Sequence, residues 1–338
     1  MKPYLIDVPV RINIWIRPEC QRRQFEILKK ARPSILFLIS DGGRNEKEWE
    51  AIRRNRAMYD AEIDWDCTVY KLYEEKNNGL YAMVGKMSKL VWSTVDRCIF
   101  LEDDMLPSVS YFRYCSELLE KYKDDTRISV ICGMNHTGRS EYVTSDYFFS
   151  RQGSIWGTAM WKRTFEKRDP DFNYAKDPYV MKLLRQRTKR NKTIWKRINA
   201  YAKQTYYEGH VAGGEFWHEF NMYGYNQLQI IPKKNLISNI GCTLDAAHAS
   251  ELKNMPRGQR KMFNMQTYEL DFPMKHPEYI MPDVEYEKKR NRILGYNYPM
   301  VKFYRKTEQF LKKVFRLQFK SIFASILKKY KGNSCIDK

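Results

Sequence analysis

The order of apolar and polar residues predicts a strand, a helix and a second strand near the start of the chain. Residues 10–16 alternate between apolar and polar side chains, as a strand with two different faces does. Residues 19–31 carry apolar side chains at helical spacing, and residues 35–39 form an uninterrupted apolar run typical of a strand buried on both faces. These three elements in succession form a βαβ unit, which predicts a parallel sheet.

The same alternation continues up to residue 135. It predicts helices at 46–60, 81–92 and 111–123 and strands at 67–73, 98–101 and 128–132. The chain beyond this point is irregular in pattern and rich in Trp, Tyr and Gly, which suits a substrate-binding half. The expected fold class is α/β, with a mixed, mostly parallel sheet and flanking helices.

The C-terminal residues 300–338 have the pattern of a basic amphipathic helical tail. Apolar residues recur at steps of three and four from Leu311 to Tyr330, and lysines and arginines fill much of the space between them. This composition is expected at an anionic membrane surface. The alternative is a helix that packs its apolar side onto the domain and leaves its lysines in water. We favour membrane binding because the apolar face is wide and rich in Phe.

The composition is that of a globular protein. Of its 338 residues, 43% are hydrophobic and 14% aromatic, which is too much apolar material for a disordered chain. No apolar run approaches the ~20 residues of a membrane-spanning helix, and the first residues do not resemble a signal peptide. The seven cysteines include no CxxC pair, which favours reduced core residues in a cytoplasmic protein over a disulfide or zinc framework.

The formal net charge of +20 is concentrated in two stretches. Residues 300–338 hold 11 Lys and Arg against two acidic residues, and residues 181–200 hold eight basic residues and no acid. The rest of the chain is nearly neutral, which argues against a protein that coats nucleic acid. For residues 181–200 the ordinary interpretation is a solvated helix face, and contact with a membrane or an acidic substrate is the alternative.

Three adjacent carboxylates, Glu102, Asp103 and Asp104, follow the apolar run that ends at Leu101. Carboxylates packed together beside a core repel one another and need a cation or strong hydrogen-bond donors. In open α/β sheets, ligands bind at the carboxyl ends of the strands. Oxygen ligands at such a place suit Mg²⁺ or Mn²⁺ shared with a phosphate-bearing substrate. The alternative is a solvated acidic turn that caps the next helix, and spacing alone does not choose between the two.

Five segments, in this order, resemble the GT-A glycosyltransferases over residues 8–250. They are 9–18, 76–80, 100–108, an aromatic block at 147–163, and 235–241 together with Asp245 and His248. The first resembles that family's first strand and nucleotide-binding turn, and the third resembles its metal motif. The chain is most similar to nucleotide-diphospho-sugar transferases of bacterial surface-polysaccharide synthesis. It is more distantly similar to the Golgi N-acetylglucosaminyltransferase that begins complex N-glycans.

This resemblance implies a role for each matching residue. Asp104 would hold Mn²⁺ or Mg²⁺, and His248 would complete the metal shell or contact the diphosphate. The implied donor-binding residues are Arg17, Asp41, Asn78, Gly79, Glu102, Asp103, Trp156 and Gly157. The donor would be a nucleotide-diphosphate sugar, with a UDP-sugar favoured, and the acceptor a glycan or a lipid-linked molecule.

Transfer with inversion, which is also implied by the resemblance, needs a base that deprotonates the acceptor hydroxyl. The family has an acidic residue beside a Trp at this place, commonly an Asp after it, whereas Trp217 is followed here by His218. Glu215, which follows two glycines, is our first choice for the base, and Glu219 is our second.

The predicted organisation is one catalytic domain and a tail. The domain spans residues 1–290, with a nucleotide-binding half at 8–135 and an acceptor half at 136–290, and the basic amphipathic tail spans 291–338. We expect a cytoplasmic enzyme that is peripheral at the inner face of the membrane and has no nucleic-acid partner.

Three other functions are weighed against this one. A non-catalytic module that binds nucleotide sugars or glycans fits the deviating base motif. A basic nucleic-acid-binding protein would use the two basic stretches for phosphate contacts but would not explain the carboxylates. A sugar nucleotidyltransferase would carry a Gly-rich phosphate loop after its first strand, where this chain has Arg17, Pro18 and Glu19.

Overall fold

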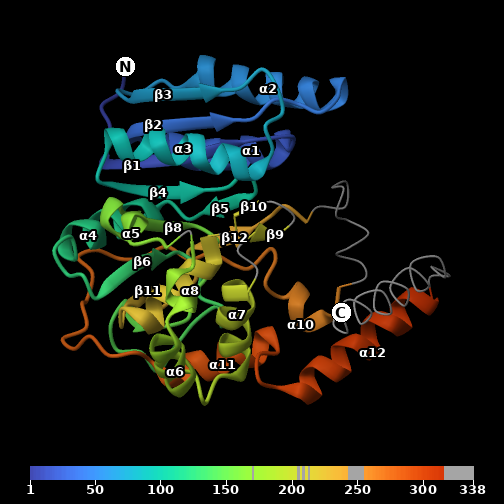
Figure 1. Ribbon diagram of the computed structural model, residues 1–338. Coiled ribbons are helices and arrows are strands. Elements are labelled where there is room, and N and C mark those ends of the chain that lie inside the picture. The colour runs from blue at the N-terminus through green and yellow to red at the C-terminus, as the bar shows by residue number, and fades with distance from the viewer. Residues whose placement is uncertain (170, 204–205, 208–209, 212–213, 243–254, 316–338) are drawn as a thin grey trace.

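The computed structural model describes the chain except for residues 170, 204–205, 208–209, 212–213, 243–254 and 316–338, and it describes no side chains within 200–217. Its centre is an eight-stranded sheet in the order β3-β2-β1-β4-β8-β6-β11-β7 (Figure 1). The strands are β1 (Ile6–Ile14), β2 (Pro33–Ser40), β3 (Thr68–Tyr73), β4 (Arg97–Leu101), β6 (Ile128–Cys132), β7 (Tyr147–Ser150), β8 (Thr158–Trp161) and β11 (Leu228–Pro232).

The sheet is mixed and mostly parallel. Strands β1 to β4 pair in parallel, and β6 pairs with β11 in parallel, whereas β8 runs antiparallel between β4 and β6 and β7 runs antiparallel at the edge. Because β8 is antiparallel to both of its neighbours, β4 and β6 end at the same edge of the sheet. The expected fold class is therefore confirmed.

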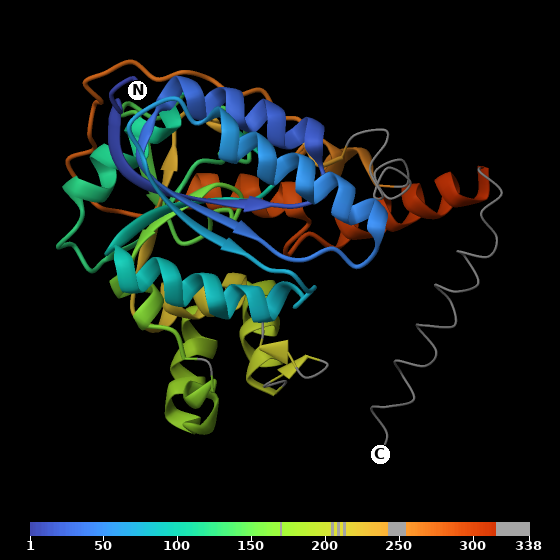
Figure 2. The same ribbon diagram turned by 90° about the horizontal axis from the view of Figure 1, so that it is seen from above.

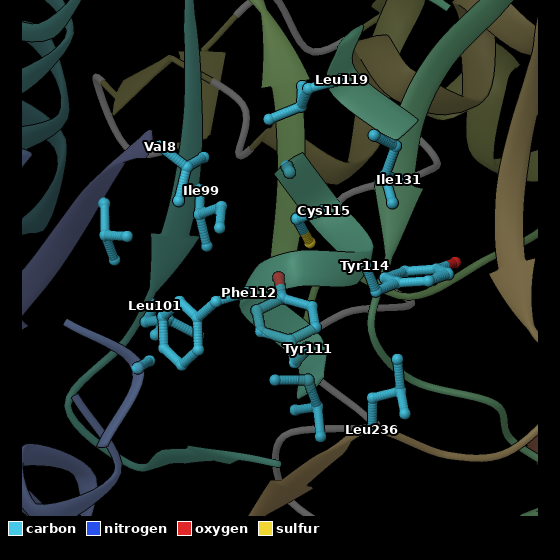
Figure 3. Packing of buried hydrophobic residues seen from close by; sticks show 14 of the residues in the cluster. Val8, Ile99, Leu101, Tyr111, Phe112, Tyr114, Cys115, Leu119, Ile131 and Leu236 are labelled. Atoms are coloured by element: carbon cyan, nitrogen blue, oxygen red, sulfur yellow. The ribbon is translucent and has the colours of Figure 1, made fainter. Parts of the chain in front are cut away.

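Helices cover both faces of the sheet (Figure 2). On one face lie α1 (Pro18–Ala31), α2 (Glu46–Glu62) and α4 (Ser110–Lys121), and on the other lie α3 (Leu80–Thr94) and α11 (Val284–Leu294). Figure 3 shows the first core, where Tyr111, Phe112 and Cys115 of α4 pack toward Ile99 and Leu101 of β4. Coverage on both sides explains why β2, β4 and β6 are mostly apolar.

The strand expected from the alternation in residues 10–16 corresponds to β1. Its polar positions are not all in water, because Arg11 is only 5% exposed and its Nη1 atom lies 2.9 Å from the sulfur of Met87 on α3. The chain after residue 135 looked irregular, yet it supplies β7, β8 and β11 to the sheet. In the structure β6, β7 and β8 follow one another without a helix between them, so the alternation of strands and helices that marks the earlier elements is lost there.

Besides the cores on the two faces of the sheet, a third hydrophobic core lies outside the sheet. It joins the 3-10 helix η1 (Asn173–Lys176) to α6 (Pro178–Arg187), α7 (Lys192–Lys203) and α8 (Gly214–Gly224), and its stacked rings include Tyr174 and Phe220. The remaining described elements are β5 (Met105–Pro107), β12 (Ile237–Asn239), β9 (Tyr206–Tyr207), β10 (His210–Val211), α5 (Lys162–Glu166), α10 (Arg257–Arg260) and α12 (Pro299–Phe315).

The predicted tail is helical where the structure describes it. Helix α12 begins at Pro299 and continues to Phe315, and the rest of the predicted amphipathic pattern, up to Tyr330, lies outside the described residues. In the described part of the chain, no helix combines the length and apolarity that crossing a bilayer demands.

The cysteines agree with the expectation of reduced core residues. Cys20, Cys98, Cys115 and Cys132 are buried, and none of the cysteines that the structure describes forms a disulfide. Burial raises the pKa of the Cys98 and Cys132 thiols to about 12, which keeps them protonated at neutral pH.

Candidate active site

The carboxyl ends of β1, β2, β3 and β4 bring the predicted residues to one edge of the sheet. Arg17 follows β1, Asp41 follows β2, and the carboxylates 102–104 follow β4. All four strands are parallel, so their ends meet at the same edge although the residues are far apart in sequence. In Figure 1 this is the side toward which the arrows of β2, β3 and β4 point.

An ion pair links Arg17 to the carboxylates. Its Nη1 atom donates to both carboxylate oxygens of Asp103 at 2.9 and 2.8 Å and to Oδ2 of Asp104 at 3.3 Å. Burial raises the pKa of Asp103 to about 6; the charge of Arg17 opposes this rise and that of Asp104 adds to it. Two adjacent carboxylates are thus held beside a core with one arginine as their cation.

Two buried glutamines on α1 fix the backbone of the acidic motif. Gln24 donates to the carbonyl oxygens of Glu102 and Met105 at 2.8 and 2.6 Å, and Gln21 donates to that of Asp103 at 3.3 Å. Both side chains are fully buried. The sequence analysis missed them, although amides at i and i+3 on the apolar side of a predicted helix were a usable signal.

The segment after β12 closes against Asp104. Strand β12 pairs antiparallel with β5, which directly follows the acidic motif, and the backbone N–H of Ile240 donates to the carbonyl of Asp104 at 2.9 Å. A Cβ atom on Gly241 would lie 2.2 Å from Oδ2 of Asp104, so only glycine fits there. The structure therefore joins two of the five matching segments directly.

His248 and Asp245 follow Gly241 but lie outside the described residues, so the predicted role of His248 stays a prediction. Within the described residues, no group of three or more His, Cys, Asp or Glu side chains is arranged to hold a metal ion. The acidic motif thus offers carboxylates from two neighbouring positions. This fits ions such as Mg²⁺, which bind through one or two carboxylates and complete their shell with substrate phosphates and water.

Asp41 binds the loop that contains Asn78 and Gly79. Its carboxylate accepts hydrogen bonds from the backbone N–H groups of Asn78 and Gly79 at 2.9 Å each and from the side chains of Asn77 and Asn78. Gly79 has φ +80°, a conformation that favours glycine. These predicted donor-binding residues therefore lie together, and in this structure Asp41 shapes the start of α3.

Trp156 and Gly157 lie at the start of β8, next to the end of β4. Thr158, the following residue, lies opposite Phe100 of β4. The ring of Trp156 is half-buried and lies 5.0 Å from that of Phe263. Trp161, which also resembled a sugar-binding residue, is a core residue whose indole N–H donates to the carbonyl of Leu119.

The two candidate bases are on α8. Glu215 is the second residue of this helix, and its side chain is not described. The carboxylate of Glu219 accepts from Nε of Arg197 on α7 at 2.9 Å. Burial lowers the pKa of the neighbouring His218 to about 3, and the nearby charge of Arg168 lowers it further. His218 is thus neutral at pH 7.

One described cavity lies away from these residues. It measures about 490 Å³ and is lined by side chains around the amino-terminal end of β4, among them Trp92, Asp96 and Lys162. A second cavity, of about 280 Å³, lies between α1 and α2. Neither cavity is lined by the acidic motif, residues 102–104. The candidate site is therefore identified by the chemistry of the side chains at the carboxyl ends of the parallel strands, here called the carboxyl edge of the sheet.

No protein-family model and no curated protein matches the chain. Solved structures with a similar fold include a mannosyltransferase from Pyrobaculum calidifontis in complex with GDP-Man and Mn²⁺ (10% identity, TM-score 0.34, 51% of this chain and 54% of that one). Another is mouse xyloside xylosyltransferase 1 in its apo form (12% identity, TM-score 0.35, 81% of this chain and 98% of that one). A third is a UDP-glucose pyrophosphorylase complexed with UDP-glucose (10% identity, TM-score 0.31, 49% of this chain and 81% of that one). The chain thus matches about half the length of the mannosyltransferase, and none of these likenesses assigns a reaction.

Proposed function

We propose that the protein is a metal-dependent GT-A glycosyltransferase that moves a sugar from a nucleotide-diphosphate donor, with a UDP-sugar favoured, to a glycan or a lipid-linked acceptor. The observation that carries this proposal is the acidic motif at the carboxyl edge, held by Arg17 and closed by Gly241. Such an edge is where open α/β sheets bind ligands. The bacterial surface-polysaccharide role and the peripheral membrane location belong to the same proposal.

Asp104, with Asp103 beside it, is the proposed holder of Mn²⁺ or Mg²⁺. When bound, this ion would act as a Lewis acid that neutralises charge developing on the diphosphate leaving group. Arg17 lies at the same carboxylates and would donate to a phosphate oxygen, since guanidinium groups bind phosphate well. Glu102 would accept from a donor hydroxyl, and Trp156 would offer its ring to a sugar face.

Asp104→Ala tests the metal role. We expect the variant to lose transfer and the Mn²⁺-dependent thermal stabilisation by nucleotide sugars, while its circular dichroism stays unchanged. Asp124→Ala, which removes an exposed carboxylate, is the control. Full turnover by Asp104→Ala in the presence of EDTA would refute the assignment.

Glu215 is the proposed base, because the carboxylate of Glu219 is held by Arg197. Glu215→Gln should keep donor affinity and lose transfer at saturating donor. Glu219→Gln should lower thermal stability, because it leaves Arg197 without this ion pair, and should keep transfer. The reverse result would exchange the two roles. A wild-type protein that binds nucleotide sugars but transfers none to any acceptor would favour the non-catalytic module.

A further inference from the structure

Helix α12 turns its polar side toward the body of the protein and its apolar side toward solvent. Arg305 donates to the carbonyl of Ile293, the carboxylate of Glu308 accepts from the backbone N–H of Arg257 at 3.1 Å, and Lys312 donates to the carbonyl of Met255 at 3.0 Å. Positions 305, 308 and 312 lie on one side of a helix. The polar side of α12 is therefore its attachment side.

The opposite side of α12 is apolar and open to solvent. Three large apolar side chains lie on this opposite side, namely Met300, Phe303 and Phe310, and they are 52% to 76% exposed. Tyr304, Leu311 and Phe315 flank the attachment side and are also 45% to 82% exposed. Lys302 and Lys306 are exposed beside them. A helix that packed its apolar side onto the domain would have these exposures reversed. The structure thus disagrees with the packed-helix alternative for residues 299–315.

The second basic stretch meets α12 at its beginning. Asn297, two residues before α12, accepts from the backbone N–H of Thr193 at 2.9 Å and donates to Asn191 at 2.7 Å. Asn191 lies in the turn between α6 and α7, in which Lys189 and Arg190 are exposed, and exposed Lys192 begins α7. In Figure 1 this turn and the start of α12 lie at the same end of the molecule, away from α2 and β3.

We propose that these two segments form one docking face for an anionic lipid surface, here called the basic-aromatic face. It consists of Lys189, Arg190 and Lys192 and of the exposed apolar side of α12. Charge complementarity favours lipid as the occupant. Residues 178–207 contain no acid, and Glu308, the one acidic residue of α12, faces the body. Exposed phenylalanines would enter the headgroup region while lysines and arginines contact anionic headgroups.

One surface contacting both segments has a measurable consequence. Three basic side chains near an anionic surface together strengthen partitioning on the order of 100-fold. If both segments contact the same bilayer, loss of either segment weakens vesicle binding by the whole factor that this segment contributes to the partition coefficient. If they faced different directions, either segment alone would hold the protein, and losing one would weaken binding only about twofold.

The experiment is co-sedimentation of the full chain with phosphatidylcholine vesicles, with and without phosphatidylglycerol. We expect binding only to the anionic vesicles, weakened on the order of 100-fold in Lys189→Gln/Arg190→Gln/Lys192→Gln. A second variant, Phe303→Ser/Phe310→Ser, should weaken vesicle binding at least tenfold. The salt dependence of the binding that this variant retains should equal that of the wild type, because the variant keeps all basic residues. The matched control is Arg23→Gln/Lys30→Gln/Lys47→Gln, which removes three exposed basic residues of α1 and α2 and should bind as wild type does.

Three results would overturn the proposal. They are equal binding to neutral and anionic vesicles, an unchanged affinity of the 189/190/192 variant, and equal losses in that variant and the control. Absence of vesicle binding by the wild type would indicate that α12 docks a protein instead. Because vesicle binding is measured without donor or metal, its failure would leave the proposed transfer reaction untouched, and failure of transfer would leave the docking face untouched.

Discussion

At the residue scale, Arg17 places a cation against two of the three carboxylates of the acidic motif. Arg17 bonds both Asp103 and Asp104, and the high pKa of Asp103, about 6, reflects how strongly burial disfavours two adjacent carboxylates. A divalent cation held by Asp103 and Asp104, as proposed above, would compensate the same negative charge as Arg17.

We predict that Arg17→Gln will make the fold more dependent on divalent cations. Loss of the guanidinium removes the ion pairs that it forms with Asp103 and Asp104 and should lower the free energy of unfolding by about 2 kcal/mol. Mn²⁺ should then raise the melting temperature of Arg17→Gln more than that of the wild type, measured without nucleotide. The control is Arg22→Gln, which breaks an exposed ion pair with Glu62 one turn later. Equal Mn²⁺ shifts in all three proteins would contradict this account.

A buried histidine gives a prediction about pH. His136 is 8% exposed, its Nδ1 lies 3.1 Å from the hydroxyl of Tyr286, and burial lowers its pKa well below 6.5, with the charge of Arg290 adding to this effect. As the pH falls below about 6.5, the unfolded chain takes up a proton at this residue and the folded chain does not. Stability conferred by the neutral ring is therefore present above that pH and lost below it.

The measurement compares wild type with His136→Gln by denaturant unfolding at several pH values. Relative to the variant, the wild type should lose about 1.4 kcal/mol of unfolding free energy for each pH unit below 6.5. The difference between the two proteins should stay constant above pH 7. A difference that does not change between pH 7.5 and 5.5 would show that His136 binds its proton equally in the folded and unfolded chains, which contradicts a lowered pKa in the fold.

At the element scale, the β5–β12 pair connects the acidic motif to the segment that follows it. This two-stranded pair holds Ile240 and Gly241 directly against Asp104. Helix α1 supports the same motif from the other side through Gln21 and Gln24. The geometry of the carboxylates therefore depends on elements that are separated by more than 200 positions in sequence.

Gly241→Ala tests this arrangement. A methyl group 2.2 Å from Oδ2 of Asp104 must displace that carboxylate, so we expect the variant to fold and to lose most of its Mn²⁺-dependent thermal shift. Gly85→Ala is the control, because a Cβ there meets nothing within 4 Å in the middle of α3. It should stabilise the protein by about 0.5–1 kcal/mol. An unchanged Mn²⁺ shift in Gly241→Ala would mean that Asp104 does not take part in metal binding.

At the scale of the whole molecule, the acidic motif and the basic-aromatic face lie at different places on the protein. The carboxyl edge carries the acidic motif, and the basic-aromatic face lies at the end away from α2 and β3 (Figure 1). Helix α12 extends past the side on which the parallel strands end. An enzyme bound through this face would present its sheet edge close to the lipid surface, which suits a lipid-linked acceptor.

Truncation after Tyr298 tests whether the proposed sugar transfer and the proposed lipid binding can be separated. The removed residues include α12, none of whose residues is buried, so the sheet and its cores should keep their stability to within about 1 kcal/mol. Transfer to a soluble acceptor should persist, and co-sedimentation with anionic vesicles should be lost. A truncated protein that sediments as the full chain does would place lipid binding elsewhere.

The sequence by itself determined the order of the elements from β1 to β6, except for the short β5, and the position of the acidic motif. Both follow from local patterns, because the apolar residues of a buried strand or an amphipathic helix recur at regular spacings within a few neighbouring positions. The expected strand at 128–132 and the helix at 46–60 correspond to β6 and α2 for this reason. The pattern after residue 135 failed because β6, β7 and β8 follow one another without intervening helices, so the strand–helix alternation is lost.

Only the tertiary structure decided which distant residues meet. The pairing of Arg17 with Asp103, the contact of Gly241 with Asp104 and the bonds of Asn297 to the α6–α7 turn join residues 86 to 137 positions apart. Such contacts depend on the order of the strands in the sheet and on the paths of the loops. Neither of these produces a regular spacing of apolar residues in the sequence. The same holds for α12: its amphipathic pattern was visible, but which side faces solvent depends on the polar groups that the body offers to Arg305, Glu308 and Lys312.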